Sequence, residues 1–100
     1  MKTDILQSIT ERLREVLPLG AHAILFGSRA RGDARHDSDW DVLILLDKPK
    51  IESADYDPLV ELGWSLNECI SPVLYTFKDW VKQHFTPFYH NVKDEGIRLV

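Results

Sequence analysis

The strongest constraint on the fold is a pair of short apolar runs, each with a polar motif at one end. The run 23–26 stops at the pair Gly27-Ser28, and the run 42–46 begins directly after Asp39 and Asp41. Wholly apolar runs of this length are typical of buried strands, and a glycine at a strand end lets the backbone approach a ligand closely. The sequence therefore predicts two buried strands with polar groups at their ends.

The pair Gly27-Ser28 predicts a phosphate-binding turn. Residues 28–31 read as the start of a short helix, whose free N–H groups and dipole favour an anionic phosphate. Nearby cations, Arg29, Arg31 and Arg35, could hold a triphosphate, and they could equally neutralise the neighbouring acidic residues. The sequence leaves both roles open for these arginines.

Asp39 and Asp41 predict a metal site. Residues two apart in a strand point to the same side, so their carboxylates can converge on one cation while Trp40 packs on the opposite face. Hard oxygen ligands favour Mg²⁺, which is completed by water and substrate phosphates. Without a cation the two charges would repel each other. Together with the turn at Gly27, the pattern indicates a site for a metal-bound nucleoside triphosphate.

Two other nucleotide- or metal-binding motifs overlap this segment and fail on their own requirements. A Walker loop needs Lys and then Ser or Thr after its second glycine, but Asp33 and Ala34 follow Gly32. An EF-hand loop beginning at Asp37 would need Gly at its sixth position and Glu at its twelfth, where Val42 and Lys48 stand.

The full string around these residues resembles the signature of the minimal nucleotidyltransferases, within the DNA polymerase beta-like nucleotidyltransferase superfamily. The matching residues are Phe26-Gly27-Ser28-Arg29-Ala30-Arg31-Gly32-Asp33 and Asp37-Ser38-Asp39-Trp40-Asp41-Val42-Leu43-Ile44. The resemblance implies that Gly27 and Ser28 contact the β- and γ-phosphates, and that Asp39 and Asp41 hold two Mg²⁺ ions during displacement at the α-phosphate. The family has a third carboxylate on the following strand, where this chain has Ser71.

The resemblance also implies a function. Small members of the family pair with a HEPN-domain protein as a toxin–antitoxin module, and we expect transfer of AMP from ATP to a hydroxyl group of that partner. The alternative is a nucleotide- or partner-binding module without turnover, because Glu68 and Asp79, the acids nearest Ser71, do not occupy its place. Transfer to an antibiotic or to RNA fits less well, since such relatives carry extra helical domains or basic extensions.

Hydrophobic periodicity predicts an α/β or α+β fold, a small mixed β-sheet flanked by helices, in agreement with the polymerase beta-like fold. A helix over 5–17 is expected after a cap at Thr3 or Asp4. A second helix, ending near Asn67, should pack across the sheet, and its apolar stripe consists of Tyr56, Leu59, Val60, Gly63, Trp64 and Leu66. The remaining expected elements are strands at 22–26, 41–46, 70–77 and 97–100, a helix at 78–85, and a helix that starts at Pro87 and stops at Gly96.

Composition narrows the function classes further. The 100 residues predict a single domain over 1–100, and the net charge of −4 argues against nucleic acid as a partner. No apolar run is long enough for a membrane span, and the lack of a signal-like N-terminus together with a single cysteine favours the cytoplasm. We expect Cys69 to be a small buried residue. The four histidines show no zinc-ligand spacing.

Overall fold

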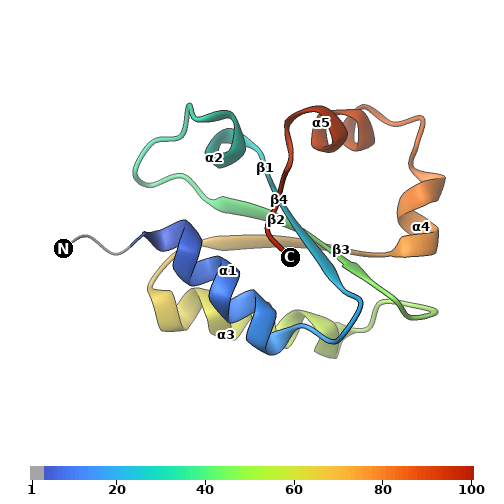
Figure 1. Cartoon of the computed structure of the whole chain (residues 1–100), viewed down its shortest axis with the longest axis horizontal. Coiled ribbons are helices and arrows are strands. Elements are labelled where there is room, and N and C mark those ends of the chain that lie inside the picture. Colours follow the sequence, from blue (N-terminus) through green and yellow to red (C-terminus); the bar gives the residue numbers. More distant parts are fainter. Residues whose placement is uncertain (1–3) are drawn as a thin grey trace.

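The computed structural model describes residues 4–100 and shows one sheet with helices on both of its faces (Figure 1). This confirms the expected α/β architecture with a mixed sheet. In chain order the elements are α1 (Ile5–Val16), β1 (His22–Phe26), α2 (Ser28–Arg31), β2 (Trp40–Leu46), the 3₁₀ helix η1 (Ser53–Tyr56), α3 (Asp57–Leu66), β3 (Ile70–Thr76), α4 (Phe77–Lys82), α5 (Pro87–Glu95) and β4 (Ile97–Arg98).

Strand pairing brings the two motifs of the sequence to one end of the sheet. Within residues 4–100 the strand order is β3-β2-β1-β4. β1 and β2 are antiparallel, with Phe26 opposite Asp41. β2 and β3 are parallel, with Asp41 opposite Ser71. The end of β1 and the starts of β2 and β3 therefore meet at the same edge.

The N-terminal helix forms as its sequence predicts. The Asp4 side chain accepts hydrogen bonds from the N–H groups of Leu6 and Gln7 and so caps the helix, while Thr3 lies outside the described residues. Ile9 and Leu13, one turn apart, are completely buried against the sheet. The helix ends before Pro18, which cannot continue it.

The sheet separates two hydrophobic clusters because alternate strand residues point to opposite faces. Trp40, Val42, Ile44 and Leu46 pack with residues of α1 and α3 in the larger cluster. This confirms that Trp40 points away from the carboxylate face. The smaller cluster lies under α4 and α5, and its buried members are Leu43, Leu45, Trp80 and Val92. Asp41 follows the alternation of Leu43 and Leu45 and so lies on this second face.

The expectation that α3 packs on the sheet is confirmed in part, and an expectation next to it is wrong. The helix buries Leu59 and Leu62 against the sheet, but Tyr56, Val60 and Trp64 of the expected stripe are exposed. The three side chains follow a spacing of four residues, which matches one helix face, and that face turns away from the sheet. Cys69, in the short connection from α3 to β3, is also exposed instead of buried.

The remaining helices are short. The helix expected at 78–85 begins at Phe77 and ends at Lys82, because the Thr76 hydroxyl accepts a hydrogen bond from the N–H of Asp79 and caps it one residue earlier. None of the helices in residues 4–100 has the length and apolar character that a bilayer span requires.

Candidate functional site

The site begins where β1 turns into α2. Gly27 has φ 75° and ψ −159°, a backbone conformation that is essentially restricted to glycine. Its carbonyl oxygen accepts hydrogen bonds from the N–H groups of Ala30 and Arg31, both at 3.1 Å. The first N–H groups of a helix have no intrahelical partner. The turn therefore directs free backbone donors toward the end of the sheet.

Asp41 lies directly against this turn. In the strand pairing it stands opposite Phe26, the residue before Gly27. A Cβ atom added at Gly27 would overlap the Asp41 Oδ2 atom. Glycine is thus required twice at this position, for its backbone conformation and for the space that the carboxylate occupies. The structure brings together Gly27 and Asp41, two residues that the sequence assigned to one site.

The charges around Asp41 show why an unneutralised carboxylate is costly here. Burial raises the pKa of Asp41, and the nearby negative charge of Asp39 raises it further. The Ser71 hydroxyl and the positive charge of Arg31 act in the opposite direction and stabilise the charged form. Asp39 itself is exposed and precedes the first residue of β2. The two aspartates are therefore close enough to repel each other.

Ser71, which stands where the resemblance implies a third carboxylate, lies on β3. The parallel register places it beside Asp41. Glu68 does not join the site, since its Oε2 atom accepts a hydrogen bond from the Trp40 indole at 3.3 Å. Asp79 pairs with Lys82 on α4. Among residues 4–100, no three His, Cys, Asp or Glu side chains gather as potential metal ligands.

Arg29 holds the segment that leads into Asp39. Its guanidinium Nη2 donates to the carbonyl oxygens of His36 at 3.1 Å and Ser38 at 2.9 Å. The guanidinium also lies over the Trp40 ring, 4.2 Å from the ring centre. These contacts make Arg29 a positioning residue. Sequence reasoning did not find this role, because bonds to backbone carbonyls leave no trace in residue spacing.

Arg31 faces the acids of the site and forms ion pairs as well. Its guanidinium lies 3.3 Å from Asp33 and 3.5 Å from Glu95, the last residue of α5. Both acids raise the pKa of Arg31, which stays charged. All three side chains are partly exposed, and ion pairs of this kind contribute little to stability. Arg31 can therefore exchange these partners for a phosphate at low cost.

The donor set of the site fits a divalent cation. Asp39 and Asp41 supply hard carboxylate oxygens whose mutual repulsion a cation would relieve. The Gly27 turn leaves room for the Asp41 carboxylate. These residues therefore suit Mg²⁺ shared with the phosphates of a nucleotide.

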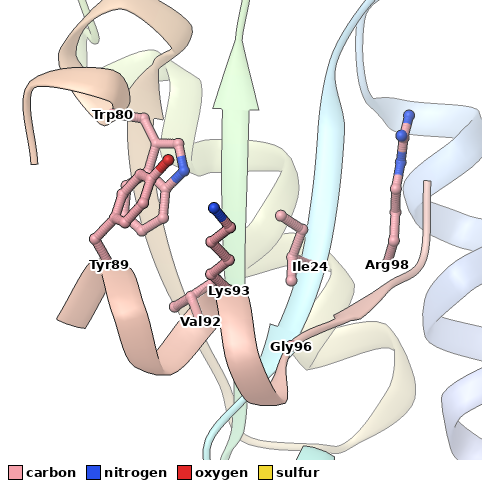
Figure 2. Close-up of a pocket in the computed structure, with 7 residues that line it drawn as sticks. All are labelled: Ile24, Trp80, Tyr89, Val92, Lys93, Gly96 and Arg98. Atoms are coloured by element: carbon pink, nitrogen blue, oxygen red, sulfur yellow. The ribbon is translucent and has the colours of Figure 1, made fainter. Parts of the chain in front are cut away.

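A separate pocket lies beside α5, on the sheet face that also carries Asp41. Its volume is about 270 Å³, and Ile24 on β1, two residues before Phe26, forms part of its wall. Figure 2 shows the Lys93 side chain between Ile24 on one side and the aromatic pair Trp80 and Tyr89 on the other. Trp80 is also a buried member of the smaller hydrophobic cluster. The lining residues are Ile24, Trp80, Tyr89, Val92, Lys93, Gly96 and Arg98.

Comparisons with known proteins identify the family and the fold of this chain. A family described as nucleotidyltransferase domain matches residues 6–95. A toxin–antitoxin crystal structure with AMP-PNP is similar over 95% of this chain and 72% of that chain, with 22% identity and a TM-score of 0.71. A mutant of the toxin–antitoxin MntA-HpeT is similar over 99% and 73%, with 21% identity and a TM-score of 0.69. At these identities the likeness establishes the fold. No curated protein matches the chain.

Proposed function

The chain belongs to the nucleotidyltransferase domain family, and we propose from its site that it transfers AMP from ATP to a hydroxyl group of a partner protein. The observation that carries the proposal is the contact between the Gly27 turn and Asp41, with Asp39 close enough to raise the pKa of Asp41. In this arrangement, backbone N–H groups that can donate hydrogen bonds to phosphate lie beside a pair of carboxylates. The similar toxin–antitoxin structure with AMP-PNP supports ATP as the nucleotide.

Each residue of the site has a defined task in this proposal. The backbone at Gly27 and Ser28 binds the phosphates, and Arg31 adds a positive charge to them. Asp39 and Asp41 would hold Mg²⁺. When bound, Mg²⁺ neutralises charge on the attacking and leaving oxygens of the displacement. Arg29 keeps the segment that carries Asp39 in place, so that both carboxylates face the phosphates.

We infer further that the acceptor protein is a HEPN-domain toxin and that this chain is its antitoxin. Similarity to two toxin–antitoxin structures supports this pairing. The partner would then be both the substrate and the source of specificity.

A second candidate function is a nucleotide- or partner-binding module without turnover. The observation that favours it is Ser71, which stands opposite Asp41 where the resemblance implies a third carboxylate. Such a module would bind the same nucleotide and the same partner. It would inhibit the partner by association alone.

Label transfer distinguishes the two functions. ATP labelled on the α-phosphate is incubated with Mg²⁺, the chain and its HEPN-domain partner, and the label on the partner is counted. The wild type should label the partner, and Asp41→Asn should reduce the rate about a thousandfold, since metal stabilisation of charge is worth several kcal/mol. Asp47→Asn, the same change at an exposed residue just after β2, is the matched control. Undiminished labelling by Asp41→Asn refutes the metal role.

Ser71→Asp tests the second candidate directly. The change supplies a carboxylate beside Asp41 at the register position of the missing acid. If the wild type binds the partner and transfers nothing, the chain is a binding module, and Ser71→Asp should introduce measurable transfer. If the wild type is active, Ser71→Asp should raise its rate by about tenfold, the effect of about 1.4 kcal/mol in the barrier. A rate that does not change shows that Ser71 does not occupy a catalytic position.

A further inference from the structure

The outer face of α3 carries an apolar stripe that the sheet does not cover. Tyr56, Val60 and Trp64 follow each other at intervals of four residues, and their exposed fractions are 36%, 48% and 82%. Residues four apart are neighbours on a helix surface, so the three side chains form one continuous stripe. A tryptophan exposed to this extent is typical of interaction sites, where Trp and Tyr supply much of the binding energy.

The stripe lies in an acidic part of the chain that has no basic residue. From residue 51 to residue 77 the sequence contains five acidic residues and no Lys, Arg or His. Asp57 and Glu61 each follow a residue of the stripe and are exposed on the same helix. The five acids are Glu52, Asp55, Asp57, Glu61 and Glu68. Only Asp55 has an ion-pair partner within residues 4–100, namely Lys48.

This charge distribution selects one kind of occupant. In a two-fold symmetric pair of copies the same patch faces itself, so Asp57 and Glu61 would face the acidic border of the second copy. Like charges brought together in this way oppose association, whereas complementary charges favour it. We propose that the α3 surface, formed by Tyr56, Asp57, Val60, Glu61 and Trp64, docks a partner protein that presents an apolar groove bordered by Lys and Arg.

The location of the α3 surface connects it to the site. α3 ends at Leu66, and the chain then passes through Glu68 and Cys69 into β3. The backbone N–H of Trp40 donates to the Cys69 carbonyl at 2.8 Å, and the Trp40 indole donates to Glu68. Trp40 stands between Asp39 and Asp41. The Trp64 end of the surface is therefore at the same end of the sheet as the two acids (Figure 1).

A partner docked on this surface would reach past β3, an edge strand, toward the phosphate turn. Docking would then deliver a hydroxyl group of the partner to the carboxylates. This last step rests on the proposed function, whereas the docking itself rests on the apolar stripe and its acidic border.

Site-specific photo-crosslinking tests the proposal. A benzophenone amino acid replaces Trp64 in one variant and Lys82, an exposed residue of α4 on the opposite sheet face, in the control. The protein crosslinked in cells is identified by mass spectrometry and purified, and its affinity for the wild type is measured at 50 mM and 500 mM NaCl. We expect a protein with a basic surface, captured at position 64 and not at position 82, whose affinity falls at high salt.

Two substitutions then probe the apolar and the charged parts separately. Trp64→Asp should weaken binding by about thirtyfold or more, the effect of losing one dominant contact residue. Glu61→Lys should weaken it about fivefold at low salt and less at high salt. Because both side chains are exposed, the urea midpoints should stay at the wild-type value, which separates lost contacts from lost folding. Capture of a second copy of this chain, equal capture at both positions, no capture, or an affinity unchanged by Trp64→Asp overturns the proposal.

The same purified partner separates this inference from the proposed function. With ATP labelled on the α-phosphate, a partner that binds through Trp64 and gains no label overturns the transfer and leaves the docking surface in place. If the Trp64→Asp variant binds and labels the partner as well as the wild type, the docking surface is overturned and the transfer stays in place. If both hold, Trp64→Asp reduces labelling through KM, with kcat close to the wild-type value.

Discussion

The two faces of the sheet differ in what covers them. On one face α1 and α3 bury a continuous cluster that includes Ile9, Leu13, Val42, Ile44 and Leu62. On the other face the short helices α4 and α5 cover a smaller cluster around Leu43, Leu45, Trp80 and Val92. The carboxylate of Asp41 and the pocket beside α5 are both on this second face.

The difference shows how a small domain combines stability with an open site. A strand such as β2 must be buried on the face that holds the fold together, and it can carry a charged residue on the other face only at its end. Asp41 occupies that end, one strand alternation before Leu43. The larger cluster therefore stabilises the sheet, and the smaller cluster leaves the end of β2 and the pocket beside α5 open.

The largest stability effect should come from neighbouring residues of β2 that point to opposite faces. Ile44 is 0% exposed in the larger cluster and Leu45 is 4% exposed in the smaller one. Replacing a buried Leu or Ile with Ala lowers the free energy of unfolding by about 2 to 5 kcal/mol, and by less where the surroundings can relax into the cavity. We expect Ile44→Ala near the upper end and Leu45→Ala near the lower end, measured by urea unfolding. Equal or reversed costs would contradict the comparison of the faces.

A smaller effect should appear at the turn of the site. Gly27→Ala should cost about 1 to 3 kcal/mol from backbone strain, and it should also abolish Mg²⁺-dependent ATP uptake, because the new methyl group displaces the Asp41 carboxylate. Gly20→Ala is the matched control, since Gly20 also has a positive φ, of 84°, but has open space around its Cα. Calorimetry should show wild-type ATP binding for Gly20→Ala. Lost binding in both variants would assign the effect to strain alone.

The smallest effect should be a gain in stability. Because burial and Asp39 raise the pKa of Asp41, its charged form is disfavoured in the folded state. Asp41→Asn should therefore raise the melting temperature in the absence of divalent metal. The gain should be complete above the raised folded-state pKa and should vanish as the pH falls below the unfolded value of about 3.9. Thermal melts between pH 3 and pH 7 measure it, and a gain that grows toward acid pH would show the opposite sign of shift.

Much of this fold follows from sequence pattern because the burial pattern of the strands is strict. The strand at His22–Phe26 is observed as expected, and the second begins one residue before the expected boundary, at Trp40. The resemblance also placed Ser71 on the following strand, where a third carboxylate was expected, and the register of that strand with β2 came from the structure. For the two motifs the same spacing that suggested a site also determines which strand ends meet.

Other features depend on contacts that no local pattern encodes. Trp64 satisfies the helical periodicity of a buried face, but α3 packs through the face that carries Leu59 and Leu62 and leaves Trp64 exposed. The η1 turn at Ser53–Tyr56 was not expected, because it is held by reciprocal bonds between Glu52 and Asp55 and by the Lys48–Asp55 ion pair. Arg29 could be identified as a cation near the phosphates, but its bonds to His36 and Ser38 required the folded chain.

Those two bonds have a consequence for how a nucleotide would enter. Arg29 belongs to α2, and its guanidinium is hydrogen-bonded to the backbone just before Asp39. The helix that would face the phosphates and the segment that carries Asp39 are therefore held together as one rigid unit. A flexible segment would lose conformational entropy when it bound a ligand. Here most of that entropy has already been lost during folding. Lysine in place of Arg29 would keep the positive charge but lose the planar guanidinium. The segment before Asp39 would then become mobile, and nucleotide binding would become slower and weaker.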